Sequence, residues 1–121
     1  MRAKPFILVI EDDSAAADSL LLVLRDWGAE VIHGRDGDAV LAAIGPRVGE
    51  VACIITDFHL GRPPDGISLV KRLRNSAPGA RVLVLSGSFS GHATAEAAAA
   101  GFEVMHKPAR AGAIINWLER A

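Results

Sequence analysis

Polar side chains that could do chemistry stand just after four of the sequence's short apolar runs. They are Glu11, Asp12 and Asp13, then Asp57, Ser86 and Lys107. Carboxylates crowded into one small site repel each other, and a bound cation relieves that repulsion. Oxygen ligands of this kind suit Mg²⁺, which keeps several of its waters and readily bridges to phosphate oxygens. The pattern therefore indicates metal-assisted phosphate chemistry.

Within such a site each side chain would have a separate chemical role. A carboxylate beside a metal ion can attack phosphorus and form an aspartyl phosphate. Lys107 would neutralise the incoming phosphoryl group as a mobile point charge. Ser86 and the backbone N–H groups of the following turn could donate hydrogen bonds to it.

The elements that must position these residues are read from hydrophobic periodicity. Continuous apolar runs of this length are typical of parallel strands covered on both faces; they span 6–10, 31–32, 51–55, 82–85 and 102–105. The second and fifth runs are more polar, as edge strands would be. Helical spacing of apolar residues, with glycine or proline as the stop, predicts helices between the runs and after the last. These helices centre on 20–27, 40–44, 67–73, 92–100 (alanine-rich) and 114–118.

Strand and helix therefore alternate five times, which predicts a parallel sheet with helices on both faces. In such a sheet the site lies beyond the carboxyl ends of the strands, where the polar residues fall. The chain has 121 residues and no linker or repeat, so we expect one domain over 1–121.

Composition excludes several classes of function. The net charge is −1, so no overall field favours nucleic acid or a membrane surface. The one cysteine, Cys53, lies in an apolar run and is interpreted as a small buried hydrophobe. The apolar run 6–10 is too short for a signal peptide or a membrane span, and we expect the cytoplasm.

These motifs, in this order, resemble the receiver domains of two-component signalling. The resemblance spans the whole chain and is carried by Ile7-Leu8-Val9-Ile10-Glu11-Asp12-Asp13, Asp57, Asp65-Gly66, Ser86 and Lys107-Pro108. It implies the flavodoxin-like (βα)5 fold: three layers around a five-stranded parallel sheet of strand order 2-1-3-4-5. It also implies a signalling switch rather than an enzyme.

The resemblance assigns roles by position. It implies that Asp57 is the phosphoacceptor and that a histidine kinase or histidine phosphotransferase supplies the phosphoryl group. Mg²⁺ would be held by Asp57, by Asp12 directly, by Glu11 through water and by the backbone carbonyl of His59. Lys107 would contact the phosphoryl group, and Ser86 would move toward it on activation. The signal would pass through the surface of the fourth helix, fifth strand and fifth helix to a downstream protein that the sequence does not identify.

The chain departs from the family pattern in three places. Val104 stands where many receivers have an aromatic switch residue, so the usual coupling between that ring and the hydroxyl is in doubt. The loop 58–66 is one residue longer than the commonest pattern, as in receivers attached to hybrid sensor kinases. No output domain follows the fifth helix, so we expect no direct contact with nucleic acid.

Other interpretations were weighed against the receiver. Three acids after the first run are electrostatically wrong for the phosphate loop of an FMN-binding flavodoxin. Asp57 lacks the Asp-x-Asp of haloacid-dehalogenase phosphatases, and Ile67 stands where a P-loop needs lysine. The acidic triplet could merely cap the first helix, and the four histidines are interpreted as surface or loop residues. The alternative that stays open is a degenerate receiver that acts only as a protein-binding module.

Overall fold

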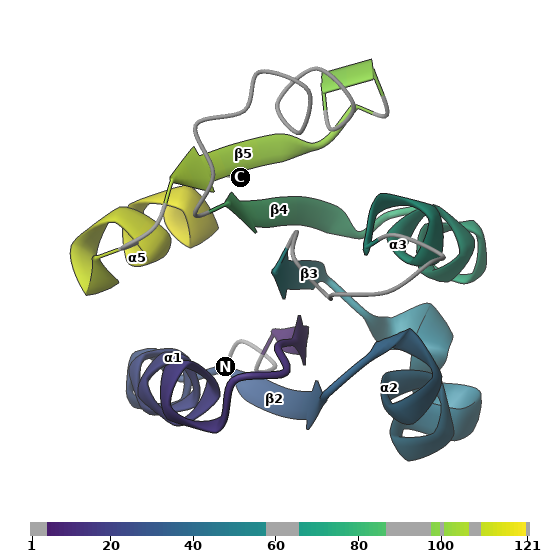
Figure 1. Ribbon diagram of the computed structural model, residues 1–121, viewed down its shortest axis with the longest axis horizontal. Helices are drawn as coiled ribbons and strands as arrows, with labels where there is room; N and C mark the ends of the chain where they lie inside the picture. Colours follow the sequence, from purple (N-terminus) through teal and green to yellow (C-terminus); the bar gives the residue numbers. More distant parts are fainter. Residues whose placement is uncertain (1–4, 58–65, 87–97, 100, 107–109, 121) are drawn as a thin grey trace.

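The sheet has the predicted strand order. The computed structural model describes residues 5–57, 66–86, 98–99, 101–106 and 110–120. Five parallel strands lie in the order β2-β1-β3-β4-β5, with β2 and β5 at the edges (Figure 1). Their bounds are β1 Phe6–Ile10, β2 Glu30–Gly34, β3 Cys53–Asp57, β4 Arg81–Ser86 and β5 Glu103–His106.

Helices cover both faces of this sheet, so the three-layer prediction is confirmed. In Figure 1, α1 and α5 lie on one face and α2 and α3 on the other. The helices are α1 Ser14–Trp27, α2 Gly37–Ile44, α3 Gly66–Ser76 and α5 Ala111–Glu119. The alanine-rich helix predicted over 92–100 lies almost wholly outside the described residues. Residues 98–99 are helical, and Gly101 after them has a φ of 81°, as a helix-ending glycine should.

One connection differs from the sequence prediction. Gly45-Pro46 ends α2 as expected, but a 3₁₀ helix (η1, Gly45–Glu50) follows. The Val51 N–H then donates to the Val48 carbonyl at 3.3 Å, which closes η1. The third strand therefore begins at Cys53, two residues later than the apolar run 51–55 predicted, although Val51 is still buried. The run was correctly interpreted as core, and its first two residues were wrongly interpreted as strand.

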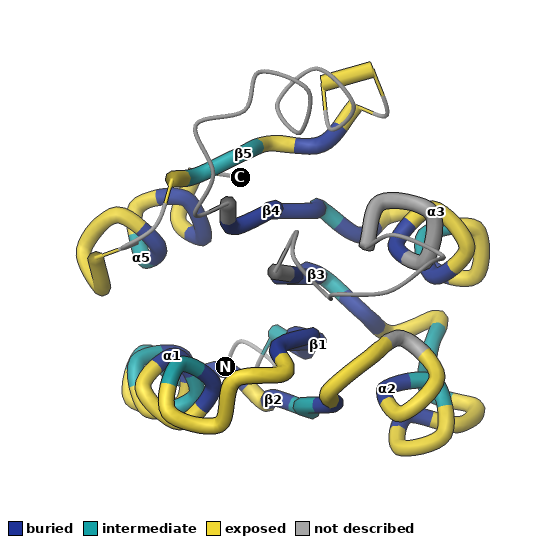
Figure 2. Tube along the Cα trace, in the orientation of Figure 1, coloured by how far each residue is buried: buried dark blue, intermediate teal, exposed yellow. Residues whose placement is uncertain are grey.

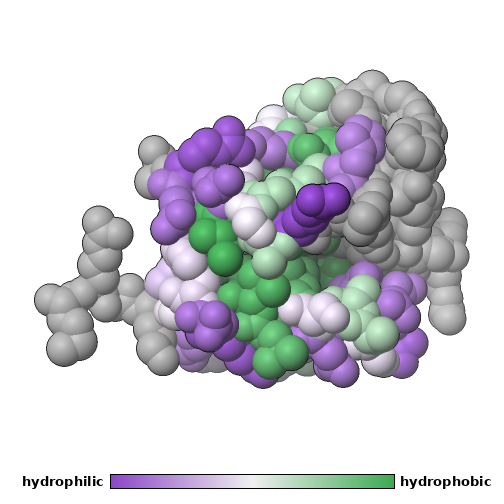
Figure 3. Space-filling model, turned by 90° about the vertical axis from the view of Figure 1, so that its left-hand side faces the viewer, coloured by the Kyte–Doolittle hydropathy of each residue, from purple (hydrophilic) through white to green (hydrophobic). Residues whose placement is uncertain are grey.

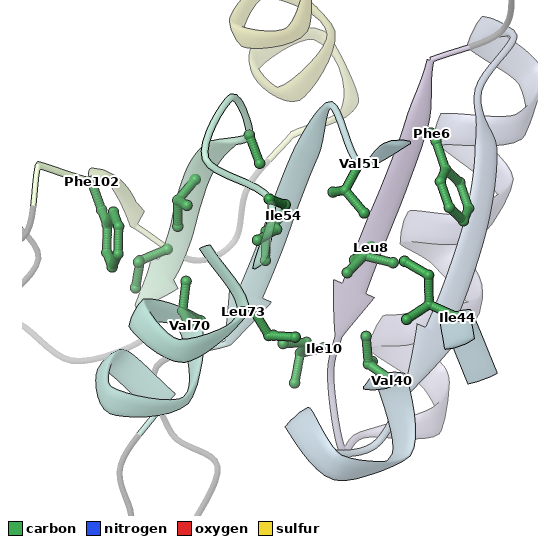
Figure 4. Packing of buried hydrophobic residues seen from close by; sticks show 14 residues of the cluster. Phe6, Leu8, Ile10, Val40, Ile44, Val51, Ile54, Val70, Leu73 and Phe102 are labelled. Carbon is green, nitrogen blue, oxygen red and sulfur yellow. The ribbon is translucent and has the colours of Figure 1, made fainter. Parts of the chain in front are cut away.

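The core consists of two hydrophobic clusters separated by the sheet. Alternate residues of β1 serve different clusters: Phe6, Leu8 and Ile10 face α2 and α3, while Ile7 and Val9 face α1 and α5. Figure 4 shows the first cluster, and Figure 2 shows that burial is concentrated in the central strands and the inner faces of the helices. A strand covered on both faces needs continuous apolarity, which is why β1 carries no polar residue.

The second cluster contains the cysteine and one of the two tryptophans, Trp117. Cys53 is buried, as predicted, and burial raises the pKa of its thiol. Trp117 is 1 % exposed, and Trp27 packs against the cluster from its edge. Viewed from the side of α1 and α5, apolar surface lies between hydrophilic patches (Figure 3). Within the described ranges, no helix has the length and apolar character that crossing a membrane requires.

Two arginines stabilise the sheet at the amino ends of its strands, which form the edge opposite the carboxyl ends. The Arg47 guanidinium lies 4.2 Å from the centre of the Phe6 ring and pairs with Glu30 at 2.7 Å. Arg81 stacks over Trp117 at 4.2 Å, and its Nη1 donates to the Trp117 carbonyl at 2.8 Å. These contacts tie η1 to β1 and β2, and α5 to β4. They lie at the opposite edge from the residues that the sequence singled out for chemistry.

Candidate functional site

Strand register brings the backbones of the candidate residues together at the carboxyl edge of the sheet. Ile10 pairs with Thr56, so Glu11 and Asp57 are the next residues on two neighbouring strands. Asp57 in turn pairs with Leu85, the residue before Ser86. Neighbouring strands are about 4.8 Å apart, so these three residues fall within about 10 Å along the sheet.

The acidic triplet after β1 splits into three environments. The Glu11 side chain is 5 % exposed, and Asp12 is exposed. Asp13 is the N-cap of α1, where its Oδ2 accepts a hydrogen bond from the Ala16 N–H at 3.0 Å. The helix-capping interpretation is therefore correct for Asp13, whereas Glu11 and Asp12 are not the capping residue.

Glu11 is held at both of its backbone polar groups by the end of β2. Its N–H donates to the Gly34 carbonyl at 3.1 Å. Its carbonyl accepts a hydrogen bond from Nε2 of His33 at 2.8 Å. His33 is a half-buried strand residue, so its interpretation as a surface or loop histidine was wrong. Its place at the end of a strand, beside the acidic loop, was the signal available in the sequence.

Several predicted site residues fall outside what the structure describes. His59, Lys107 and the loop 58–65 lie outside the described residues, and so do the side chains of Asp57 and Ser86. Within the described part, no three His, Cys, Asp or Glu side chains form a group that could hold a metal. The carboxylates of Glu11 and Asp12 are nonetheless possible oxygen ligands for a metal ion, the first buried and the second exposed. Oxygen ligands of this kind suit a hard divalent cation.

Strand β5 places Val104 beside β4. Val104 pairs with Val84, is partly buried, and packs against the cluster beneath α2 and α3. His106, the last residue of β5, pairs with Ser86. The position that carries an aromatic residue in many receivers is therefore occupied here by a small side chain in the packed sheet.

Gly34 is packed too closely against α2 to accept a side chain. A Cβ on Gly34 would lie 2.5 Å from Cγ2 of Val40 and 2.7 Å from its backbone nitrogen. Because one of these atoms is backbone, a change of side-chain rotamer cannot relieve the clash. Gly34→Ala should therefore lower the free energy of unfolding by about 1–3 kcal/mol, measured by urea denaturation.

Gly49→Ala is the matched control, because a Cβ there meets nothing within 4 Å. Its stability should stay within about 0.5 kcal/mol of the parent. Equal stability of the two variants would show that α2 does not pack against Gly34 as closely as the structure has it.

Comparison with known proteins identifies the family. The chain matches the response regulator receiver domain family over residues 7–119. It is similar to a response regulator from Burkholderia pseudomallei, solved with a phosphorylated aspartic acid, a calcium ion and citrate. That match has a TM-score of 0.83 and 30 % identity over 97 % of this chain and 68 % of the other. The chemotaxis regulator CheY4 of Vibrio cholerae shares the fold, with a TM-score of 0.82, 23 % identity and 98 % of each chain covered.

The chain belongs to the response regulator receiver domain family of two-component signalling. Receiver domains take phosphoryl groups from histidine kinases or phosphotransferases, and the membership is consistent with phosphorylation-dependent switching. The transcriptional regulatory protein ZraR of Salmonella typhimurium is 28 % identical over the whole of this chain. The chain spans 27 % of that relative's length, and a transcriptional regulator is partly at odds with the expectation of no contact with nucleic acid.

Proposed function

We propose that this domain is a signalling switch in which Asp57 accepts a phosphoryl group from a phosphohistidine. The observation that carries the proposal is the register of β1 and β3. Because Ile10 pairs with Thr56, the buried Glu11 follows β1 at the level where Asp57 ends β3, and the exposed Asp12 is the next residue in the chain. Membership of the receiver family supports the same assignment.

The transfer is a displacement at phosphorus. A carboxylate oxygen of Asp57 attacks the phosphorus atom, a P–O bond forms and the P–N bond to the donor's imidazole breaks. The leaving imidazole then takes up a proton. In this proposal Lys107 carries the compensating positive charge, and Ser86, which ends the neighbouring strand, donates a hydrogen bond to a phosphoryl oxygen.

A divalent cation fits the proposed site. Asp12, Asp57 and the backbone carbonyl of His59 would hold Mg²⁺, with Glu11 acting through water. When bound, the ion supplies positive charge that screens the carboxylates and the phosphoryl oxygens. The calcium ion reported with the phosphorylated regulator of Burkholderia pseudomallei supports a divalent ion at such a site.

Phosphorylation would be read on the surface of the fourth helix, β5 and α5. Ser86 pairs with His106 at the end of β5, so a displacement of Ser86 reaches this strand directly. The phosphoryl group would thereby shift an existing conformational equilibrium rather than drive catalysis on another substrate. We propose that the domain works in the cytoplasm with a histidine kinase or phosphotransferase and a further protein partner, and does not itself contact nucleic acid.

The test is labelling of the intact domain with a small acyl phosphate. In the presence of Mg²⁺, intact-mass analysis should show one added phosphoryl group, and EDTA should abolish the addition. Borohydride reduction should then map the modified residue to Asp57. Beryllofluoride with Mg²⁺ should also shift the amide signals of Val104 and His106. A folded domain that is neither labelled nor shifted would instead support the protein-binding alternative.

A further inference from the structure

The His33 side chain reaches from β2 to the loop that carries Glu11 and Asp12. Its Nε2 lies 2.8 Å from the carbonyl oxygen of Glu11, 22 residues away in the sequence. A carbonyl oxygen can only accept, so the ring nitrogen at this distance carries the hydrogen. This hydrogen bond does not require a charged ring, and the half-buried position of His33 shields it from competing water.

This bond fixes the peptide group that leads into Asp12. The Glu11 carbonyl belongs to the planar peptide between Glu11 and Asp12, so fixing that oxygen fixes the plane. The Glu11 N–H is held as well, by the Gly34 carbonyl at 3.1 Å. On the other side of Asp12, Asp13 is fixed as the N-cap of α1. The exposed Asp12 thus stands between two anchored neighbours.

We propose that His33 is a positioning residue for the cation site, which it serves by orienting the backbone beneath Asp12. This inference rests on the proposed function, because it concerns the same site. The expected gain is in metal affinity: a preoriented carboxylate loses less conformational freedom when the ion binds. Hydrogen bonds that orient metal ligands are commonly worth 10–100-fold in affinity.

The experiment compares Mg²⁺ affinity in His33→Leu and His33→Gln, measured by amide chemical-shift titration of the whole domain. His33→Leu removes the donor and should weaken Mg²⁺ binding about tenfold. His33→Gln keeps an N–H donor and should recover most of that loss. Ile44→Val is the control for stability: it trims the core beneath α2 and should leave Mg²⁺ affinity unchanged.

The outcomes separate the two proposals. If the parent protein shows no saturable response to Mg²⁺, the proposed metal site itself fails. If the parent binds Mg²⁺ and His33→Leu binds it equally well, only the role of His33 is overturned. A glutamine variant as weak as the leucine variant would overturn it too, as would an equal loss of affinity in Ile44→Val.

Discussion

Asp57→Asn should reduce phosphoryl incorporation from about one group per chain to none. An amide is not a nucleophile toward phosphorus, so the variant loses the attacking oxygen while its shape is almost unchanged. The measurement is intact mass after incubation with Mg²⁺ and a small acyl phosphate. Asparagine can still extend β3, because the pairing of Asp57 with Leu85 involves the backbone. Because the change also removes one of several neighbouring negative charges, loss of labelling should occur in a protein that unfolds at a urea concentration no lower than that of the parent.

Asp26→Asn is the matched control, since it makes the same chemical change at an exposed position on α1. It should be labelled like the parent. Labelling that persists in Asp57→Asn would show that another residue accepts the phosphoryl group, and the assignment would be wrong. Equal loss of labelling in Asp26→Asn would point to a general effect of charge rather than to a nucleophile.

Trp117→Ala should cause the largest loss of stability among the changes considered, about 3–5 kcal/mol. Trp117 is 1 % exposed and fills the cluster between α5 and the sheet. Its ring also supports the Arg81 guanidinium at 4.2 Å, and that contact would be lost. Because domains of this kind are stable by only about 5–15 kcal/mol, the variant should be partly unfolded at modest urea concentrations. Urea denaturation followed by circular dichroism measures the change.

Two further variants test the reason for this loss. Among the described residues, Nε1 of Trp117 has no hydrogen-bond partner, so Trp117→Phe sacrifices packing but no hydrogen bond. It should cost about half as much as the alanine change. Trp27→Ala removes the same side chain from the partly buried rim of the same cluster and should cost less than Trp117→Ala. A larger loss at Trp27 would contradict the burial seen at the two positions.

Stability and proposed chemistry are thus placed at opposite edges of the sheet. The arginine contacts to Phe6 and Trp117 fasten the edge where the strands begin. The carboxyl edge carries instead Glu11, a buried acid, and Asp12, an exposed one. Like charges close together oppose folding unless a cation or phosphoryl-binding groups compensate them. The stability that the arginine contacts contribute at the opposite edge offsets the repulsion between these charges in the proposed site.

The sequence alone determined which segments form buried parallel strands. It also determined that the candidate residues lie just after the ends of those strands. Unbroken apolar runs require strands buried on both faces, and helical spacing between them requires parallel crossovers. Once the strands are parallel, every residue that follows a strand must fall at the same edge. The positions of Glu11, Asp57 and Ser86 were therefore predictable from local pattern, and the strand order 2-1-3-4-5 came from the family resemblance.

Only the tertiary structure decided how residues distant in sequence meet. The extra 3₁₀ turn before β3, the stacking of Arg81 on Trp117 and the closeness of Gly34 to Val40 all depend on how elements pack. The contact between His33 and Glu11 spans 22 residues and follows from the register of β1 with β2. Local periodicity shows which face of an element is buried, whereas pairwise contacts across elements depend on register and packing distance. For this reason the acids were found from the sequence, and the histidine that holds their loop was not.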